Sequence, residues 1–127
     1  MNKFVIDSWA WVEYLNGTER GFEVKKIIES GNKLFTSIIS LAEVISVAKR
    51  KNMDIDVVEN AVVSNSEIVE IDKQIVREVG IFHGEMKRKI DDFGLGDAFV
   101  VIAARSLEAK ILTGDPHFRK IREAVMI

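Results

Sequence analysis

The segment LGDAFVVIAARSLEAKILTGD, residues 95–115, decides the fold of this chain. Residues 96–109 are apolar on nearly all sides, which predicts a helix buried at the centre of the molecule. Residues 111–113 form a short apolar run of the kind found in buried strands. Gly114 and Asp115 follow that run directly. The segment therefore predicts a buried helix that leads into a buried strand, with an aspartate just beyond the strand.

The same alternation of apolar runs and helical patterns extends over the rest of the chain. Apolar runs predict further strands at 4–6, 34–36 and 68–71. A short fifth strand is predicted at 124–127, and the sequence does not indicate which strand it pairs with. Apolar periodicity and end signals predict helices at 19–30, 38–51, 54–64 and 73–90. Strands separated by helices indicate parallel pairing through right-handed crossovers. We therefore expect an α/β fold, a three-layer α/β/α sandwich around a small parallel sheet of four to five strands.

Length and composition limit the class of protein. A chain of 127 residues fits one domain, and we expect residues 1–127 to form it. Cysteine is absent, which excludes disulfides, thiolate metal sites and cysteine nucleophiles and suits a reducing compartment. No apolar run approaches the roughly 20 residues of a membrane span, and no signal peptide is recognisable. We expect a soluble, cytoplasmic protein without membrane contact.

The overall charge says little about nucleic-acid binding. The chain has 18 basic and 20 acidic side chains, a net charge of −2, whereas nucleic-acid binders are often basic. The distribution of charge matters more than its sum, however. A carboxylate cluster of the kind found in metal-dependent nucleases also lowers the net charge by itself, so the balance does not exclude a nucleic-acid binder.

Four acidic residues, far apart in the sequence, are predicted to meet at one edge of the sheet. Asp7 directly follows the strand at 4–6, and Asp115 follows the strand at 111–113 after one glycine. Glu43 lies in the first turns of the helix after the second strand, and Asp97 in the first turn of the central helix. In such sheets the ligand site lies at the carboxyl ends of the strands. All four carboxylates begin near that edge.

A shared carboxylate site has an electrostatic cost that points to a cation. Neighbouring carboxylates repel one another and are driven toward the protonated form unless a positive charge intervenes. Oxygen ligands without histidine or cysteine suit Mg²⁺ or Mn²⁺. Such a site activates water and screens the charge that develops on a phosphodiester during attack. The pattern therefore favours metal-dependent phosphodiester chemistry.

Each acid also has a plainer interpretation. Asp7 is a favoured helix N-cap residue, and Glu43 could be a solvated helix residue. Asp97 suits the positive end of a helix dipole, and Asp115, before a proline, suits the start of a turn. Four unrelated caps and turns have no reason to share one sheet edge, so the joint pattern favours a site.

Four motifs resemble those of the PIN-domain family. The first is VIDS at 5–8 with Trp11, the second SIISLAEV at 37–44, and the third LGDAFVVIAA at 95–104, which is the most specific. The fourth, ILTGDPHF at 111–118, includes a phenylalanine three residues after the acid. The motifs occur in the expected order over nearly the whole chain. Length and the lack of further modules resemble the VapC-type toxins within that family.

This resemblance implies an endoribonuclease that uses Mg²⁺ or Mn²⁺ and cuts RNA. Asp7, Glu43, Asp97 and Asp115 would be its catalytic, metal-binding tetrad. Asp7 and Asp97 would be the firmest ligands, with Glu43 completing the inner ring and Asp115 holding a second metal or an ordered water. The family also implies a homodimer and a small antitoxin protein whose tail lies across the site.

Other polar residues receive lesser roles. Ser8 and Thr113 are expected to hydrogen-bond an acid or a water ligand of the metal. Arg119, within one turn of Asp115, is the best candidate for a phosphate contact to RNA, although basic residues near helix ends are commonly only solvated. His117 has no second histidine at ligand spacing, which favours a surface or packing role.

Four further residues are expected to have structural or solvent roles. We expect Asp91 and Asp92 to lie in a solvated loop. Whether either side chain reaches the acidic site stays an open question of the sequence. Trp9 and Trp11 are expected to pack the first helix or a dimer contact rather than to stack RNA bases.

Two other function classes compete with the nuclease. A phosphoacceptor signalling domain needs a pair of acids after the first strand and an acceptor aspartate after the third. Here Ser8 and Trp9 follow Asp7, and the aspartate after the third strand is Asp72. Trp9 also breaks the Asp-x-Asp pattern of phosphatases that use an aspartate nucleophile. A catalytically silent binding module on the same fold stays open.

Overall fold

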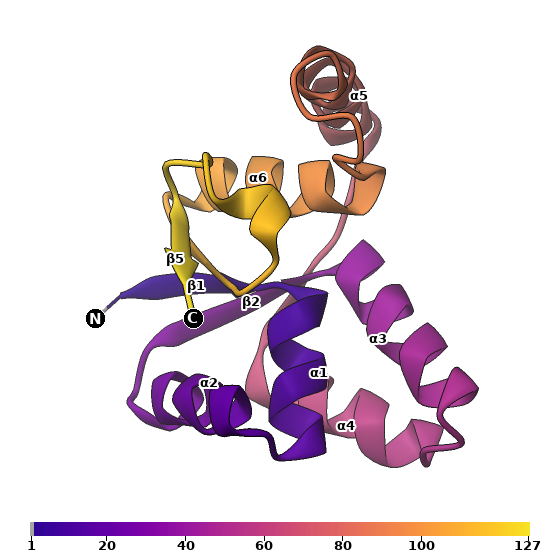
Figure 1. Ribbon diagram of the computed structural model, residues 1–127, viewed down its shortest axis with the longest axis vertical. Coiled ribbons are helices and arrows are strands. Elements are labelled where there is room, and N and C mark those ends of the chain that lie inside the picture. The colour runs from indigo at the N-terminus through magenta and orange to yellow at the C-terminus, as the bar shows by residue number, and fades with distance from the viewer. Residues whose placement is uncertain (1) are drawn as a thin grey trace.

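The computed structural model (Figure 1) describes residues 2–127. It contains a five-stranded sheet in the order β3-β2-β1-β4-β5. Every neighbouring pair of strands is parallel. The strands are β1 (Lys3–Ile6), β2 (Lys33–Ser37), β3 (Glu67–Val69), β4 (Lys110–Thr113) and β5 (Ala124–Met126). The predicted parallel sheet of four to five strands is confirmed, including the pairing of the last strand with β4.

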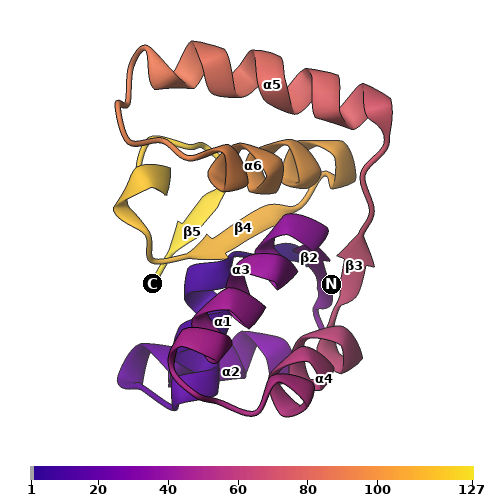
Figure 2. The same ribbon diagram turned by 90° about the vertical axis from the view of Figure 1, so that its right-hand side faces the viewer.

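Helices cover both faces of the sheet (Figure 2). One face carries α1 (Ser8–Asn16), α2 (Glu19–Glu29), α3 (Ile38–Arg50) and α4 (Ile55–Asn65), and the other carries α5 (Lys73–Lys87) and α6 (Leu95–Leu107). The predicted three-layer arrangement is thus present. Among the described residues, no helix has both the length and the apolar character that crossing a bilayer requires.

The central position of α6 explains its sequence. It lies between the sheet on one side and α5 on the other (Figure 2), so two opposite faces of the helix are covered. Its residues Ala98, Val100, Val101 and Ala104 are fully buried. A helix covered on two faces needs apolar residues on both, which confirms the prediction from residues 96–109.

The strands bury alternate residues in two separate cores. Val5 and Ile111 face the core beneath α6, whereas Ile6 and Leu112 face the core beneath α1 and α3. This alternation follows from the two-residue period of a strand. Trp11 is fully buried in the second core, and its indole N–H donates to Thr36 Oγ1 at 3.0 Å. The predicted packing role is therefore confirmed for Trp11.

Three predicted elements end at least two residues earlier than expected. Helix α6 stops at Leu107 rather than at 109, because Glu108 adopts the left-handed conformation. Helix α5 stops at Lys87 rather than at 90, where the chain tightens into a turn and the Lys89 N–H donates to Met86 O three residues back. This turn lets Phe93 enter the core, where it is fully buried. Strand β3 stops at Val69 rather than at 71. The chain leaves the sheet there because the Asp72 carboxylate caps α5, accepting from Ile75 N–H at 2.9 Å.

Candidate metal centre

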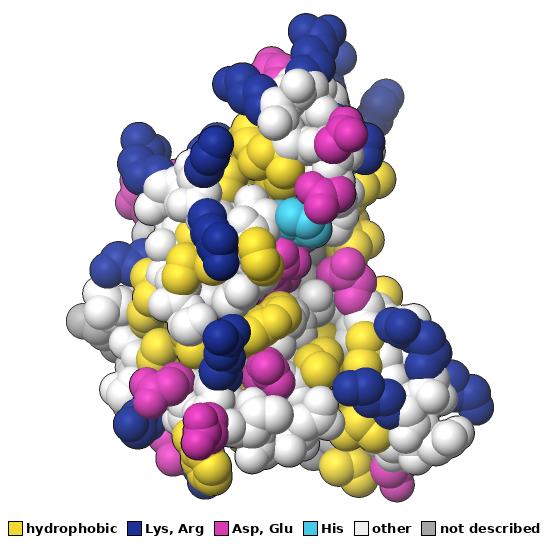
Figure 3. Space-filling model, viewed as in Figure 1, with side chains coloured by type: hydrophobic (Ala, Val, Ile, Leu, Met, Phe, Trp, Pro, Cys, Tyr) yellow, Lys and Arg dark blue, Asp and Glu magenta, His cyan; other side chains and the backbone are white. Residues whose placement is uncertain are grey.

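The four predicted acids occupy the carboxyl edge of the sheet. Asp7 follows β1 and Asp115 follows the adjacent strand β4, while Glu43 lies in the second turn of α3 and Asp97 in the first turn of α6. In the space-filling view, acidic side chains gather around a histidine in the middle of one face, with Lys and Arg on both sides (Figure 3). The folding of the chain therefore brings these carboxylates together.

Asp7 is the most deeply buried of the four, with 3% of its surface exposed. It occupies the N-cap position of α1, yet its side chain makes no capping hydrogen bond. Thr113 Oγ1 instead donates to Asp7 Oδ2 at 2.8 Å. Burial raises the pKa of Asp7 to about 7, the charges of Asp97, Asp115 and Glu43 add to the rise, and the Thr113 hydrogen bond opposes it. The carboxylate is thus directed into the acidic cluster rather than along the helix.

Thr113 connects two of the acids. Its hydroxyl donates to Asp7 and accepts the backbone N–H of Asp115 at 3.0 Å, and the residue is fully buried. With its single proton committed to Asp7, the hydroxyl has a fixed orientation. The predicted hydrogen bond from Thr113 to an acid is therefore present in the structure.

Glu43 reaches the cluster through a close approach to Gly96. A Cβ atom placed on Gly96 would lie 2.7 Å from Glu43 Oε2, closer than side-chain atoms tolerate. Burial of the carboxyl raises the pKa of Glu43, and Asp97 and Asp115 add to the rise, whereas a hydrogen bond with the Ser8 hydroxyl lowers it. The residue as a whole keeps an exposed surface, but its carboxyl group is held inside the cluster.

Asp97 serves the helix and the cluster at once. The backbone N–H of Gly94, the N-cap residue of α6, donates to Asp97 Oδ2 at 2.8 Å. Burial raises the pKa of Asp97 and the charge of Asp115 raises it further, whereas the Gly94 hydrogen bond and His117 lower it. The helix-terminus interpretation of this acid is therefore correct, and it does not compete with a place in the site.

Asp115 likewise combines two roles. Its carboxylate accepts the backbone N–H of His117 at 2.9 Å and so begins the 3₁₀ turn η1 (Pro116–Phe118). The turn predicted before Pro116 is thus present. At the same time the charge of Asp115 raises the pKa values of Asp7, Glu43 and Asp97, which places its carboxylate among theirs.

His117 and Asp92 lie in the same cluster, which sequence reasoning did not predict. His117 Nδ1 lies 3.2 Å from Asp115 Oδ1 and 3.5 Å from Asp97 Oδ2, and Nε2 lies 3.0 Å from Asp92 Oδ2. The Asp92 hydrogen bond, followed by the charge of Asp115, raises the pKa of His117. The histidine in turn lowers the pKa of Asp92, which is otherwise exposed. The turn at Pro116 was the available signal, since it folds His117 back toward Asp115.

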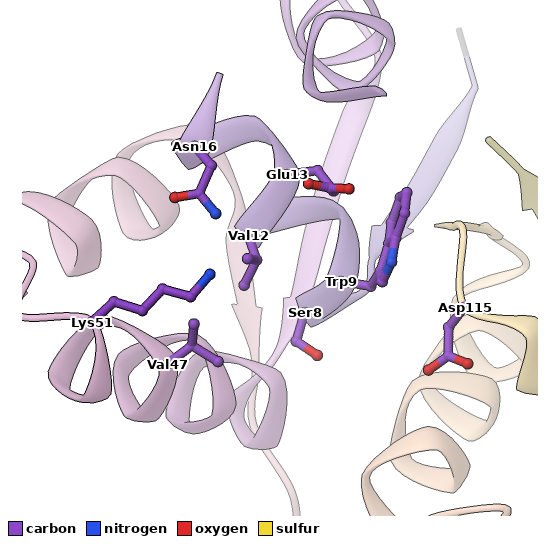
Figure 4. Close-up of a pocket in the computed structure, with 8 residues that line it drawn as sticks. All are labelled: Ser8, Trp9, Val12, Glu13, Asn16, Val47, Lys51 and Asp115. Carbon is purple, nitrogen blue, oxygen red and sulfur yellow. The ribbon is translucent and has the colours of Figure 1, made fainter. Parts of the chain in front are cut away.

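Three hollows adjoin the acids, and one of them, of about 420 Å³, lies beside Glu43 and Arg50. The other two meet the cluster at Asp115 and at His117. The first of these two, of about 410 Å³, lies between α1 and α3 (Figure 4) and is lined by Ser8, Trp9, Val12, Glu13, Asn16, Val47, Lys51 and Asp115. The second, of about 490 Å³, is lined by Ile90, Asp92, Pro116, His117, Arg119 and Lys120. Each hollow contains a member of the cluster at one end and at least one cationic side chain.

Trp9 stands beside the first hollow, between α1 and the loop of Asp115 (Figure 4). Its ring packs so closely on Gly114 that a Cβ atom there would collide with it, and the Arg20 guanidinium lies 5.7 Å from the ring centre. Trp9 therefore packs the first helix against the β4 loop, as predicted, and also forms a wall of the hollow.

The donor set fits a hard divalent cation. Asp7, Glu43 and Asp97 have raised pKa values, and the charges of neighbouring carboxylates contribute to the rise in each case. A divalent ion would reverse that repulsion, and carboxylate oxygens are the ligands that Mg²⁺ and Mn²⁺ prefer. One ligand atom each from Asp97, Asp115 and His117 also lie within 4.8 Å of one another.

Fold and site together define an α/β protein with a carboxylate centre at the carboxyl edge of a parallel sheet. A sequence profile of the PIN domain family matches residues 4–124, so the chain belongs to the PIN domain family. The resemblance predicted from the four sequence motifs is thereby confirmed. None of the curated proteins matches the chain significantly.

Solved structures share this fold over almost the full chain. DNA-bound VapBC from Salmonella typhimurium has 25% identity and a TM-score of 0.73, covering 100% of this chain and 98% of its own. A toxin–antitoxin complex from Klebsiella pneumoniae has 21% identity and a TM-score of 0.73, covering 96% and 95%. VapC20 from Mycobacterium tuberculosis, described as a toxin that cleaves the sarcin–ricin loop, has 12% identity and a TM-score of 0.69, covering 84% and 85%.

Proposed function

We propose that this chain is a metal-dependent endoribonuclease that hydrolyses RNA phosphodiester bonds, and that it is the toxin of a type II toxin–antitoxin pair. The observation that carries the proposal is the convergence of Asp7, Glu43, Asp97 and Asp115, where burial and then mutual repulsion raise pKa values. Membership of the PIN domain family supports nuclease chemistry. One similar structure is described as a toxin–antitoxin complex and another as a toxin that cleaves the sarcin–ricin loop, which supports the biological role.

In this proposal the four acids are the catalytic, metal-binding residues. Asp7, Glu43 and Asp97 hold the ion, Mg²⁺ or Mn²⁺, and Asp115 holds a second ion or an ordered water. A bound ion of this kind activates water and screens the charge that develops on the phosphate. Thr113 keeps the Asp7 carboxylate oriented through its hydrogen bond. Ser8, whose hydroxyl lies beside Glu43, does the same for that residue.

The RNA strand runs along the first and second hollows in this proposal. Lys51 lies at the far end of the first hollow from Asp115 (Figure 4), and Arg119 and Lys120 line the second. These cations are placed to contact phosphates on either side of the bond that is cut. The net charge of −2 is thus compatible with RNA binding because the cations gather where the strand would lie.

The protein partners follow from the toxin proposal. We propose that a small antitoxin inhibits the chain by laying its tail over the acids, and that two copies of the chain form a homodimer in the cytoplasm. One similar structure is described as a toxin–antitoxin complex and another as DNA-bound VapBC, which supports a protein partner. An adjacent short gene that encodes a DNA-binding antitoxin would support this role, whereas its absence would favour general RNA processing.

The test of the activity is cleavage of defined RNAs by the purified chain. We expect cleavage with Mg²⁺ or Mn²⁺, no cleavage with a chelator, and a loss of at least about 100-fold in Asp97→Asn, since even groups that only orient metal ligands are worth about 10–100-fold. An asparagine still accepts the Gly94 N–H, so the start of α6 is retained. Asp91→Asn, which removes the same charge from an exposed neighbouring loop residue, is the matched control.

The competing function classes give different results in the same assay. Equal cleavage by Asp97→Asn and the parent chain would assign the activity to a contaminant and remove the proposal. A silent binding module would bind a partner and leave RNA whole. A phosphoacceptor domain would take up label from acetyl phosphate, but Asp72, the aspartate after β3, is engaged in capping α5.

A further inference from the structure

His117 is held in one orientation by carboxylates on both sides of its ring. On the outer side, Nε2 lies 3.0 Å from Asp92 Oδ2. On the inner side, Nδ1 lies 3.2 Å from Asp115 Oδ1 and 3.5 Å from Asp97 Oδ2. An ionised carboxylate only accepts hydrogen bonds, so Asp92 favours a proton on Nε2 and Asp115 favours a proton on Nδ1. Without a metal the ring therefore carries both protons, and a divalent ion that displaced the Nδ1 proton would meet the Nδ1 lone pair together with the oxygens of Asp115 and Asp97.

In the metal-free protein the Nδ1 proton lies between the ring and these carboxylates, and a divalent ion can take the place of that proton. We propose that His117 Nδ1 is a nitrogen ligand of a divalent ion that it shares with Asp97 and Asp115, and that Asp92 orients the ring for this purpose. The inference rests on the metal dependence contained in the proposed function. A histidine that binds a metal through one nitrogen almost always donates from the other to a carboxylate, carbonyl or water. Asp92 supplies that acceptor.

The separations of the three donor atoms fit one coordination shell. Metal–oxygen bonds of about 2.0–2.1 Å in an octahedron place neighbouring ligand atoms about 3 Å apart. The distances of 3.2 Å and 3.5 Å from Nδ1 to the two carboxylate oxygens are close to that value. Small side-chain movements would complete the shell without a change in the backbone, because η1 already fixes His117 next to Asp115.

A nitrogen ligand would change which metal the site prefers. Imidazole suits transition metals, whereas Mg²⁺ prefers oxygen ligands. An all-carboxylate cluster has no such bias. We therefore expect the chain to bind Mn²⁺ more tightly than Mg²⁺, and we expect this preference to depend on His117 and Asp92.

The test is pulsed electron paramagnetic resonance of the Mn²⁺-loaded chain, which detects nitrogen bound to the metal. The chain has two histidines, and the other, His83, has its Nε2 at 3.1 Å from Phe93 O. We expect nitrogen modulation in the parent chain and in His83→Gln, and its loss in His117→Gln. Calorimetry should show Mn²⁺ affinity falling about 10–100-fold in Asp92→Ala, with Mg²⁺ affinity changed less and Asp91→Ala unchanged.

The outcomes separate this inference from the proposed function. Mn²⁺ binding without a nitrogen signal, or with a signal that persists in His117→Gln, overturns the ligand assignment and leaves the ribonuclease proposal standing. A nitrogen signal in a chain that cuts no RNA supports the ligand assignment and counts against the ribonuclease. Failure to bind Mn²⁺ overturns the inference. Circular dichroism shows whether His117→Gln is folded. Asp92→Ala keeps the His117 ring, so a lower Mn²⁺ affinity in that variant reports the lost orientation of the ligand and not its removal.

Discussion

The Asp7 carboxyl is buried beside three other acids with one hydroxyl donor, Thr113, to support its charge. Its pKa is raised from 3.8 to about 7, so near neutral pH the metal-free protein holds a proton there about half of the time. A raised acid pKa means that the folded state binds this proton more tightly than the unfolded state does. Stability from this group is therefore present below about pH 4 and is lost as pH rises toward 7.

Replacing Asp7 by asparagine should stabilise the metal-free protein at pH 8. The shift from 3.8 to about 7 corresponds to a gain of about 4 kcal/mol at most, because the variant has no charge to bury. The difference in unfolding free energy between Asp7→Asn and the parent chain should grow between about pH 4 and pH 7 and stay constant above pH 7. Urea unfolding with a chelator, at several pH values, measures it. Parallel pH profiles for the two proteins would contradict the assignment.

The same variant should respond differently to metal. Mn²⁺ at pH 8 is expected to raise the melting temperature of the parent chain, because an ion that binds only the folded state stabilises it. The shift should be smaller in Asp7→Asn, which has lost a ligand. Asp56→Asn, on an exposed turn of α4, serves as the charge-matched control.

Thr113 should matter for cleavage through its hydroxyl alone. Thr113→Val keeps the shape but leaves Asp7 Oδ2 and the Asp115 N–H without their partner, so we expect a loss of about 10–100-fold in RNA cleavage. Thr113→Ser restores the donor and should recover most of the rate. If valine and serine variants cut equally well, the hydrogen bond does not orient the site.

In helix α6, a single glycine, Gly96, leaves room for the carboxyl group of Glu43. Ala is the better helix former by about 1 kcal/mol, yet Gly96 lies in the first turn. A Cβ there would meet the carboxyl of Glu43, which is the flexible end of a long side chain. The fold could accommodate an added methyl group if the Glu43 side chain moved away. Glu43 would then no longer lie in the cluster.

Gly96→Ala should therefore separate stability from activity. We expect the melting temperature to change little, because Glu43 swings away, and cleavage to fall by about 10-fold or more, because the acid leaves the site. Gly84→Ala, in the exposed middle of α5 with no atom within 4 Å of the new Cβ, should gain about 0.5–1 kcal/mol and cut normally. Equal activity of the two variants would show that Glu43 is dispensable.

The elements and the edge at which the acids meet were predictable, because both follow from periodicity and from strand direction. The four acids each follow or begin an element that the hydrophobic pattern marks. Asp92 and His117 were not predictable in this way, because both sit in loops whose course depends on the turns at residues 88–93 and 116–118. The end of α5 was missed for the same reason, since Ile90 keeps the helical spacing while the chain already turns.

For the molecule as a whole, the arrangement of charge matters more than its sum. The chain is slightly acidic, yet cations lie on both sides of the acidic cluster (Figure 3). Each phosphate contact on a single strand contributes about 0.7 to the slope of binding against salt. RNA binding should thus be salt-sensitive despite the net charge of −2.

Arg119→Gln should weaken RNA binding several-fold and lower the salt slope by about 0.7. The measurement is fluorescence anisotropy at several salt concentrations, in the Asp97→Asn background so that the RNA stays intact. Lys110→Gln is the matched control, since Lys110 starts β4 and lies at the opposite edge of the sheet. A control that loses as much affinity as Arg119→Gln would mean that binding is not localised at the second hollow.

The position of β1 between β2 and β4 has a consequence for synthesis of the protein. Asp7 is made early, but the neighbouring strand β4 and Asp115 are made more than 100 residues later. A nascent chain therefore holds Asp7 without the hydroxyl of Thr113 and without the fourth carboxylate. The cluster can form only after residue 115 has been synthesised, so a shorter nascent chain has no complete site.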